Sequence, residues 1–390
     1  MAERRFKLPG EEELNKDQDR VLALPEDGQY LVVGGPGTGK SVVALLRALK
    51  FQDNKDYIFL VYNHVLESAT CQLINTDLKG TTLVKLFYKL YWHLFKEFVP
   101  QIEAHKPDYD LIIKKITELN NYSERSQHLI IDEGQDMPLK YYEVLQYAGY
   151  THFFIVADQN QQITEDNSSR TELTNLLGLE VKDVLELKIN YRNSNHIAIF
   201  ANHFFTDKSS PAPDLPEKDS LDTPVFYKGK SLDDYIEMIL READKDNRNL
   251  IGVVVANNNM RKRYYDKLNS LEITLDHSKP IISSYSSSDK QNVNINFSQG
   301  GIVVLNDKSI KGLEFDVVYI VLDGFRIYNN DKTSMKKRLY VMSSRAIKKL
   351  VLVSTQREPG IISLLPEDEM IMRIIDDVKK PEPVTAFSPF

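Results

Sequence analysis

Residues Tyr30–Ser41 read YLVVGGPGTGKS, a short apolar run that ends in a glycine-rich loop. The loop fits the pattern G-x-x-x-x-G-K-[ST], with Gly34, Gly39, Lys40 and Ser41 at its defined positions. Glycines allow backbone N–H groups to turn inward on a polyphosphate, and the positive N-terminal end of a following helix attracts the same charge. The stretch therefore predicts a phosphate-binding loop between a strand and a helix.

The two side chains that end the loop predict which nucleotide species binds. Lys40 supplies a mobile positive charge for the β- and γ-phosphates, and the Ser41 hydroxyl is an oxygen ligand suited to Mg²⁺. The next segment, 42–51, has the pattern of an apolar-faced helix, which favours a nucleotide loop over an ordinary glycine turn. We therefore expect ATP and Mg²⁺ as cofactors. The loop residues expected around the phosphates are Gly35, Gly37, Thr38, Gly39, Lys40 and Ser41.

Length and composition place the chain among globular proteins of more than one domain. A chain of 390 residues is too long for one ordinary core, and its 42% hydrophobic and 27% charged residues are typical of soluble proteins. No stretch predicts a membrane span, and the N-terminus lacks the apolar segment of a signal peptide. The single cysteine, Cys71, excludes an intrachain disulfide framework. We expect a cytoplasmic enzyme.

The net charge limits how the protein could bind nucleic acid. A formal charge of −7 and a pI near 5.7 argue against coating of nucleic acid through bulk positive charge, but they leave room for a local basic groove. Three basic runs are candidates, although such runs more often form solvated faces. They are Arg261–Arg263, Lys336–Arg338 and Lys348–Lys349.

Apolar runs alternate with helical patterns twice along the chain. This alternation is typical of parallel sheets in an α/β protein, and the second half repeats it without a phosphate loop. We predict an N-terminal ATP-binding domain at 1–187, a second α/β domain at 188–378 and a loose tail at 379–390. Residues 206–224, rich in Pro, Ser and Asp, predict an exposed loop.

Two longer segments have helical patterns. Residues 82–127 read as mostly helical, with Trp92 and several Tyr and Phe assigned to the core. In the second half, SMKKRLYVMSSRAIKK (334–349) reads as one helix that precedes a strand.

Carboxylates follow two of the apolar runs. QHLIIDEGQD (127–136) places Asp132 and Glu133 at a strand end, where ligands of open α/β sheets bind. Asp132 is suited to hold Mg²⁺, and Glu133 to orient and deprotonate a water molecule. HFFIVADQNQQI (152–163) repeats the pattern, and its Gln161 is a candidate sensor of the γ-phosphate. Each pattern is weak alone and gains force from the phosphate loop before it.

Seven motifs in order resemble those of superfamily 1 helicases of the UvrD/Rep type, over about residues 14–355. Any one could arise by chance, whereas seven in the family's order would not. They are LNKDQ (14–18), GGPGTGKS (34–41), IIDEGQD (130–136), VADQNQQI (156–163), NYRN (190–193), SIKGLEFDVV (309–318) and LYVMSSRA (339–346).

The resemblance implies an α/β fold of two RecA-like P-loop domains with parallel sheets and ATP in the cleft between them. It also implies a role for each matching position. Gln18 would bind the adenine edge and Tyr191 would stack on it, while Glu133 would activate water and Gln161 would couple the γ-phosphate to movement. The positions expected to reach the nucleotide from the second-domain side are Arg192 and Arg345, at the γ-phosphate, and Gly312 and Glu314, with Glu314 at the ribose.

The resemblance further implies a motor that acts on nucleic acid. Two domains that close on ATP and open after hydrolysis can step alternately along a strand. The partner is expected to be single-stranded DNA, lying across the tops of both domains. The matching strand-contacting segments are Tyr62–His64, Thr82–Lys85 and Lys308–Lys311.

Departures from the family pattern leave alternatives open. The gaps at 89–128 and 195–306 leave little room for the family's large inserted subdomains. The leading interpretation is a DNA helicase or single-strand translocase of 3′ to 5′ polarity. The alternatives are a nucleotide-switched ATPase subunit of a bacterial repair or anti-phage defence complex, and an RNA-directed ATPase. Phe387 and Phe390 of the tail could anchor a protein partner, but a plainly disordered tail is the favoured interpretation.

Overall fold

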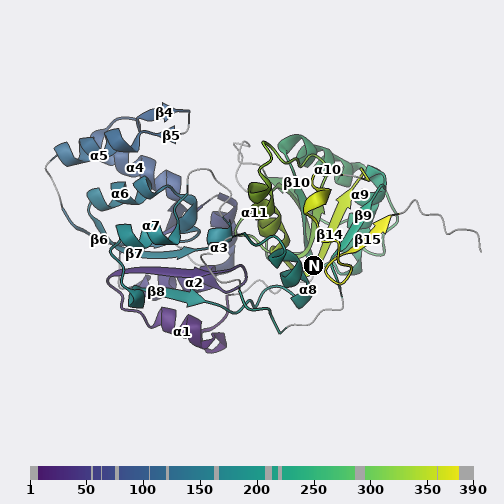
Figure 1. Cartoon of the computed structure of the whole chain (residues 1–390), viewed down its shortest axis with the longest axis horizontal. Coiled ribbons are helices and arrows are strands. Elements are labelled where there is room, and N and C mark those ends of the chain that lie inside the picture. Colours follow the sequence, from purple (N-terminus) through teal and green to yellow (C-terminus); the bar gives the residue numbers. More distant parts are fainter. Residues whose placement is uncertain are drawn as a thin grey trace, which may run out of the picture.

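A computed structural model contains two α/β units that lie side by side (Figure 1). The structure describes residues 8–53, 56–62, 64–74, 79–104, 106–119, 123–161, 167–206, 213–217, 222–285, 295–357 and 359–376.

The first unit is built on a six-stranded sheet in which every pair of neighbouring strands is parallel. The strand order is β3-β2-β6-β7-β1-β8, so β1, which leads into the phosphate loop, lies between β7 and β8. Register pairs Val33 of β1 with Ala157 of β7, which brings their carboxyl ends to one edge. The strands are β1 Gln29–Gly34, β2 Tyr57–Val61, β3 Gly80–Thr82, β6 Arg125–Ile131, β7 Tyr150–Ala157 and β8 Val184–Leu187.

Helices cover both faces of this sheet because the strands are apolar on both sides. Leu31 and Val33 of β1 face one cluster of buried side chains, whereas Tyr30 and Val32 face another. The helices are α1 Lys16–Leu22, α2 Lys40–Phe51, α3 His64–Ile74, α4 Leu83–Phe95, α5 Tyr109–Glu118, α6 Leu139–Tyr147 and α7 Arg170–Leu176. Short 3₁₀ turns lie at η1 Glu11–Glu13, η2 Gly134–Asp136, η3 Gln159–Gln161 and η4 Val181–Asp183.

The second unit repeats this design with a seven-stranded parallel sheet of order β11-β12-β10-β13-β14-β9-β15. Its strands are β9 Val225–Lys228, β10 Leu250–Val255, β11 Ile282–Tyr285, β12 Gly301–Asn306, β13 Phe315–Val321, β14 Ala346–Ser354 and β15 Arg373–Asp376. Its helices are α8 Asn195–Asn202, α9 Leu232–Lys245, α10 Asn258–Ser270 and α11 Lys332–Ser343, with a 3₁₀ turn η5 Ile362–Leu364.

The predicted fold class is confirmed: the chain is α/β, with two large all-parallel sheets of the RecA-like kind. The first sheet ends with β8 at Leu187, and the second begins with β9 at Val225. The domain boundaries at 187/188 and 378/379 stay predictions. The tail at 379–390, with its two candidate anchor residues, lies outside the described residues.

Two predictions about elements are wrong. Trp92 is not in the core, since 49% of it is exposed on the outer side of α4, and residues 82–127 contain a small hairpin of β4 Gln101–Glu103 and β5 Lys106–Pro107. The predicted helix 334–349 ends at Ser343, and its last residues open β14. Ala346 pairs with Phe315 of β13, so pairing with a neighbouring strand overrides the local helical pattern there.

The two units touch through α3. The side-chain amide of Gln72 donates to the carbonyl oxygen of Ile295 at 2.7 Å and accepts from the backbone N–H of Phe297 at 2.8 Å. Ala69, on the same helix, packs into the main hydrophobic cluster of the second unit. Figure 1 shows α3 and α11 between the two sheets.

Among the helices that the structure describes, none has the length and apolar character needed to cross a membrane.

Candidate functional site

The phosphate loop leaves the carboxyl end of β1 and enters α2, as the sequence predicts. Gly37 and Gly39 have φ of +74° and +89°, the left-handed region that favours glycine. A Cβ at Gly37 would lie 2.1 Å from the side-chain oxygen of Asn190, and one at Gly39 would lie 2.2 Å from the amide nitrogen of Gln18. The loop is therefore a backbone-lined cradle enclosed by segments far apart in the sequence.

Lys40 is the positive charge of this cradle. Its ammonium donates to the carbonyl oxygens of Gly34 and Gly35 at 2.9 and 2.7 Å, and it lies 3.6 Å from a carboxylate oxygen of Asp158. Burial lowers the pKa of Lys40, while Asp158 acts in the opposite direction. The ammonium spans the loop where phosphate oxygens could replace those carbonyl groups.

Asp132 and Ser41 form the pair suited to Mg²⁺. The Ser41 hydroxyl hydrogen bonds to the Asp132 carboxylate, which is buried. Burial, together with the charge of Glu133, raises the pKa of Asp132 to about 6. Two hard oxygen ligands at the mouth of a phosphate cradle are what Mg²⁺ bound to a nucleotide requires. The residues present therefore fit ATP with Mg²⁺.

Glu133 is the candidate base, and its environment holds it ionised. Burial alone would raise its pKa, but Lys311, Arg345 and Lys40 bring positive charge, and the net effect is a lowered pKa. Its backbone has φ of +56°, the left-handed region that residues other than glycine rarely adopt and that recurs at functional sites. An ionised carboxylate beside the cradle is able to accept a proton from water.

Gln135 is a functional candidate that the sequence did not single out. Its amide donates to Glu133 at 2.6 Å and accepts from the backbone N–H of Asp158 at 3.0 Å. This fully buried side chain therefore joins the end of β6 to the end of β7. Only its place in the motif IIDEGQD could have pointed to it, because a glutamine after a strand carries no signal of its own.

Lys311 contradicts one expectation. It belongs to a predicted strand-contacting segment, yet its side chain is fully buried in the first unit. The ammonium donates to Asp136 at 2.7 Å, lies 3.7 Å from Glu133 and also bonds to the carbonyl oxygen of Gln161. It also lies over the ring of Tyr62, at 5.8 Å from the centroid. A side chain so enclosed has no surface left for a nucleic-acid strand.

Gln161 joins the two units. Its side-chain nitrogen donates to Asp158 at 2.7 Å, and its side-chain oxygen accepts from the guanidinium of Arg345, which belongs to the second unit. Arg345 is buried, and although burial lowers its pKa to about 10, it stays charged at neutral pH. A continuous chain of contacts thus runs from Arg345 through Gln161 and Asp158 to Lys40.

Arg192 and Glu314 meet each other beside the cradle. The Arg192 guanidinium donates to the Glu314 carboxylate at 2.7 Å, and a Cβ added at Gly37 would lie 2.8 Å from the Cβ of Arg192. In this arrangement the two predicted nucleotide contacts neutralise one another. Each would have to exchange its partner to reach a nucleotide.

Gln18 and Tyr191 lie near each other on the α1 side of the loop. Gln18 is buried, and its amide donates to the carbonyl oxygen of Thr38 at 3.1 Å and accepts from the backbone N–H of Asn15 at 3.1 Å. The Tyr191 ring is half exposed, and its hydroxyl hydrogen bonds to Asn15. The backbone N–H of Tyr191 donates to the carbonyl oxygen of Gly37. An exposed ring beside a fixed amide is suited to an adenine base.

Not every predicted site residue comes to the cradle. A Cβ added at Gly312 would lie 2.6 Å from a methyl group of Leu66, so this glycine is needed where the second unit crosses α3. The ring of Tyr62 is in contact with the Lys311 ammonium, His64 is exposed, and Asn63 lies outside the described residues. The cradle itself brings together Gln18, Gly35, Gly37, Thr38, Gly39, Lys40, Ser41, Asp132, Glu133, Gln161, Tyr191, Arg192, Glu314 and Arg345.

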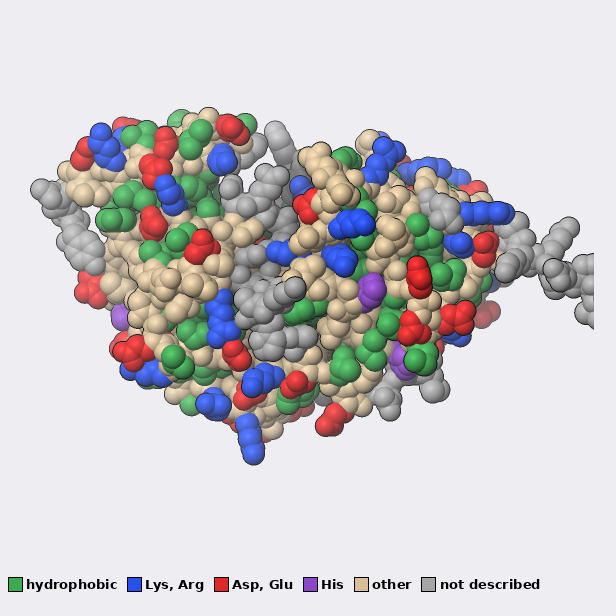
Figure 2. All heavy atoms as spheres, in the orientation of Figure 1, with side chains coloured by type: hydrophobic (Ala, Val, Ile, Leu, Met, Phe, Trp, Pro, Cys, Tyr) green, Lys and Arg blue, Asp and Glu red, His purple; other side chains and the backbone are tan. Residues whose placement is uncertain are grey.

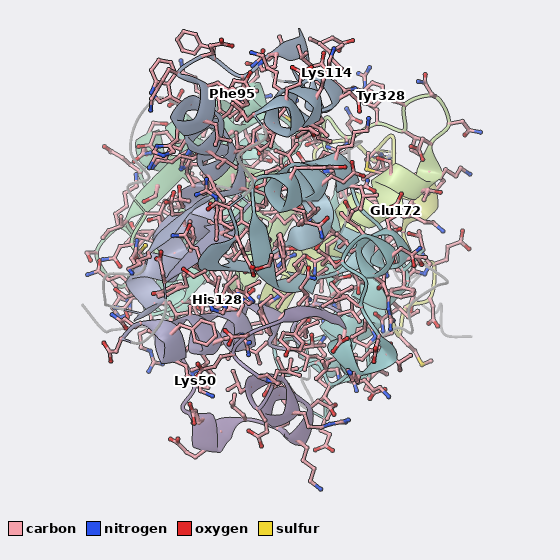
Figure 3. All side chains as sticks on the ribbon, turned by 90° about the vertical axis from the view of Figure 1, so that its left-hand side faces the viewer. Lys50, Phe95, Lys114, His128, Glu172 and Tyr328 are labelled. Atoms are coloured by element: carbon pink, nitrogen blue, oxygen red, sulfur yellow. The ribbon has the colours of Figure 1, made fainter. Side chains whose placement is uncertain are left out.

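A second cluster of metal-binding side chains lies at the opposite edge of the first sheet. The ligand atoms of Asp27, His128 and His152 all lie within 4.8 Å of one another, before β1 and on β6 and β7. However, the two imidazole rings are stacked with only 14° between their planes, and one ion cannot lie in both planes. His152 also accepts from the backbone N–H of Gly28. Figure 3 shows His128 low on the first unit.

Comparison with protein families gives one match that spans most of the chain. Residues 28–357 match the model described as Schlafen group 3, DNA/RNA helicase domain. A comparison with curated protein sequences finds no match.

Three solved structures are similar. The C-terminal domain of a possible DNA helicase from Lactobacillus plantarum WCFS1 has 17% identity and a TM-score of 0.33, covering 47% of this chain and 98% of that one. Arterivirus nonstructural protein 10, a helicase, has 13% identity and a TM-score of 0.38, and the PRRSV helicase has 12% and 0.40. These two alignments cover 90% and 88% of this chain but only 64% and 54% of the viral chains.

Proposed function

The chain belongs to the Schlafen group 3 DNA/RNA helicase domain family, and on this premise we propose that it is an ATP-dependent nucleic-acid motor. It hydrolyses ATP to ADP and phosphate with Mg²⁺ at the phosphate loop. Within helicases we assign it to the UvrD/Rep-type superfamily 1 pattern, on the strength of its seven ordered motifs. The observation that carries the proposal is the contact between Gln161 and Arg345, which connects the loop to the second unit.

The proposed chemistry follows from the positions of the side chains. Lys40 leaves the carbonyl groups of Gly34 and Gly35 for the phosphates, and Asp132 and Ser41 hold Mg²⁺. Glu133 accepts the proton of the attacking water. Arg345 exchanges its bond to Gln161 for the γ-phosphate, where it stabilises the charge of the transition state.

Movement follows from the same exchange. Two of the buried contacts that cross between the units reach residues proposed to flank the γ-phosphate: Lys311 lies 3.7 Å from Glu133, and Arg345 bonds to Gln161. ATP binding therefore competes with these contacts, and hydrolysis restores them. Alternation between the two arrangements changes how the units sit on a strand, which is the physical basis of stepping.

We propose single-stranded DNA as the track and 3′ to 5′ as the direction, in the cytoplasm. The second candidate is a nucleotide-switched ATPase with little unwinding, or an RNA-directed one. It is favoured by the small size of the segment between α4 and α5, which holds one hairpin, β4–β5, in place of a large inserted subdomain.

Unwinding assays separate these candidates. Duplexes of DNA with a 3′ or a 5′ single-stranded tail, and matching RNA duplexes, are incubated with protein, ATP and Mg²⁺. The proposal predicts ATP-dependent separation of the 3′-tailed DNA duplex and none with Lys40→Ala. ATP turnover without strand separation would favour the switch, and preference for the RNA duplexes would favour the RNA-directed enzyme.

A further inference from the structure

The outer face of α4 carries positive charge and an aromatic ring in a chain that is acidic overall. Lys85, Lys89, Trp92 and Lys96 follow one another at spacings of four, three and four residues. Such spacings place side chains on one side of a helix. The opposite side of α4 packs into the core through Leu83, Leu86, Phe87, Leu90 and Tyr91. The four residues, named here the α4 stripe, therefore point to solvent.

The lysines of the α4 stripe have no counter-ion in the part of the chain that the structure describes. Among the described residues, no ion pair or side-chain hydrogen bond involves Lys85, Lys89 or Lys96. Only two acidic residues occur between Lys79 and Pro107, and the nearer of them, Glu97, is bound by Lys115 at 2.5 Å. The stripe thus keeps its charge available for an anion from outside.

The aromatic part of the stripe is an open platform. Trp92 is 49% exposed and its ring lies 5.7 Å from that of Phe98, which is 88% exposed on the loop after α4. Indole and phenyl rings left in water at this level of exposure offer faces on which flat, apolar groups can stack. Figure 3 shows this part of the molecule at the top, where Phe95 of α4 and Lys114 of α5 are labelled.

We propose that the α4 stripe is a binding site for single-stranded nucleic acid, whose phosphates contact the lysines and whose bases stack on Trp92. This inference rests on the proposed function and extends the contact surface along α4, beyond the predicted strand-contacting segment that ends at Lys85. α4 ends at Phe95, and Lys96 is its C-cap. From Lys85 to this cap the helix rises about 17 Å, room for roughly five stacked nucleotides. The stripe also continues from Thr82–Lys85, a predicted strand-contacting segment, and Thr82 caps α4 by accepting from the Lys85 N–H at 3.3 Å.

The chemistry selects a single strand over a protein partner or a duplex. Regularly spaced lysines without acids match a phosphate backbone, and base stacking on an exposed indole needs unpaired bases. Figure 2 shows Lys or Arg side chains both on the part that carries α4 and on the second unit, where the two face each other. A strand that crosses both units could therefore reach the stripe.

The chain offers a direct optical test because Trp92 is its single tryptophan. Oligo-dT and oligo-rU, labelled for anisotropy, are titrated into wild-type protein while tryptophan emission is recorded. The proposal predicts that emission changes with the same midpoint as anisotropy. A strand that binds by anisotropy and leaves the emission unchanged overturns the α4 site while the proposed function stands. Absence of binding by every strand overturns the proposed function itself.

Matched variants test charge and stacking separately. Trp92→Ala should weaken strand binding about tenfold, while Tyr147→Ala, which removes another half-exposed ring, should leave binding unchanged. Lys89→Ala/Lys96→Ala should lower the slope of log K against log salt by about 1.4. The control is Lys114→Ala/Lys140→Ala, which removes the same number of positive charges from lysines that are paired with Glu118 and Asp110. This control should lower the slope of log K against log salt by less. Equal effects of variants and controls would overturn the proposal, and ATP turnover without nucleic acid should stay at the wild-type level throughout.

Discussion

At the scale of single residues, the proposed function makes Asp132 the residue that decides when Mg²⁺ can bind. Burial raises the pKa of Asp132 to about 6. Below that pH the carboxyl group is protonated and a proton occupies the oxygen that Mg²⁺ needs. The half-saturating Mg²⁺ concentration for ATP turnover should be constant above about pH 7 and rise about tenfold per pH unit below pH 6. Mg²⁺ titrations from pH 5 to 8 measure this, and an inflection near pH 4 would contradict the raised pKa.

Lys311 is the residue whose removal should cost most in stability. Lys311→Met leaves the buried Asp136 without its cation and removes one of the three cations near Glu133, and loss of one partner of a buried ion pair costs about 3–5 kcal/mol. Asp136→Asn in the same chain removes the main orphaned charge, so the double variant should regain much of the loss. Urea unfolding of wild type and the three variants gives the comparison. Additive losses would show that the pair is not coupled.

Sequence reasoning predicted which residues of the candidate site lie together, but it misplaced Lys311. Lys40, Ser41, Asp132 and Glu133 could be predicted because strand ends and a helix N-terminus fix where they meet. The burial of Lys311 could not, because it depends on how the second unit docks on the first. No local pattern distinguishes a lysine that faces solvent from one that enters a neighbouring unit.

At the scale of elements, the phosphate loop is held in shape by contacts with the segment before α8. A Cβ at Gly37 would lie 2.1 Å from Asn190, in addition to the strain of its positive φ. Gly178, at φ of +62° with nothing within 4 Å of a Cβ, is the matched control for strain alone. Gly178→Ala should cost about 1 kcal/mol of unfolding free energy and leave ATP binding unchanged, because only its backbone is affected.

Gly37→Ala should lose more stability than Gly178→Ala and also lose ATP affinity, because Asn190 and the loop must move apart. Thermal unfolding and nucleotide titration test both variants. If Gly37→Ala binds ATP as wild type does, the loop is not held by the Asn190 segment.

The elements show which sequence signals are reliable. Long apolar runs such as those of β1, β6 and β7 predicted strands correctly because buried parallel strands need apolar side chains on both faces. Short edge strands were missed: β11 and β15 flank the second sheet, and part of β11 falls in a polar stretch. The helix predicted at 334–349 was too long at its C-terminal end. AIKK (346–349) fits a helix or a strand equally well, and only pairing with β13 decides that it is a strand.

At the scale of the whole molecule, Arg345 reports whether the two units act together. Arg345→Ala removes the guanidinium that the second unit places on Gln161. ATP binding should change little, because the loop residues remain, while the hydrolysis rate should fall roughly 10³-fold, the loss typical of an arginine finger. Single-turnover hydrolysis beside nucleotide titration measures both. Loss of ATP binding would count against the proposed role.

The two-unit architecture could be predicted from the alternation of strands and helices, and the fold class is confirmed. The contacts that couple the units could not be predicted, because Gln72, Lys311 and Arg345 reach across an interface formed by residues more than a hundred positions apart. Coupling is a property of this interface, and it is also what the proposed motor requires.

The rate of ATP hydrolysis without and with single-stranded DNA tests the central claim most directly. Duplex DNA and single-stranded RNA serve as comparisons, and Glu133→Gln gives the background rate. A motor driven by closure of the two units should hydrolyse ATP slowly alone and at least tenfold faster with single-stranded DNA. An equal rate in all four conditions, above the Glu133→Gln background, would contradict the account.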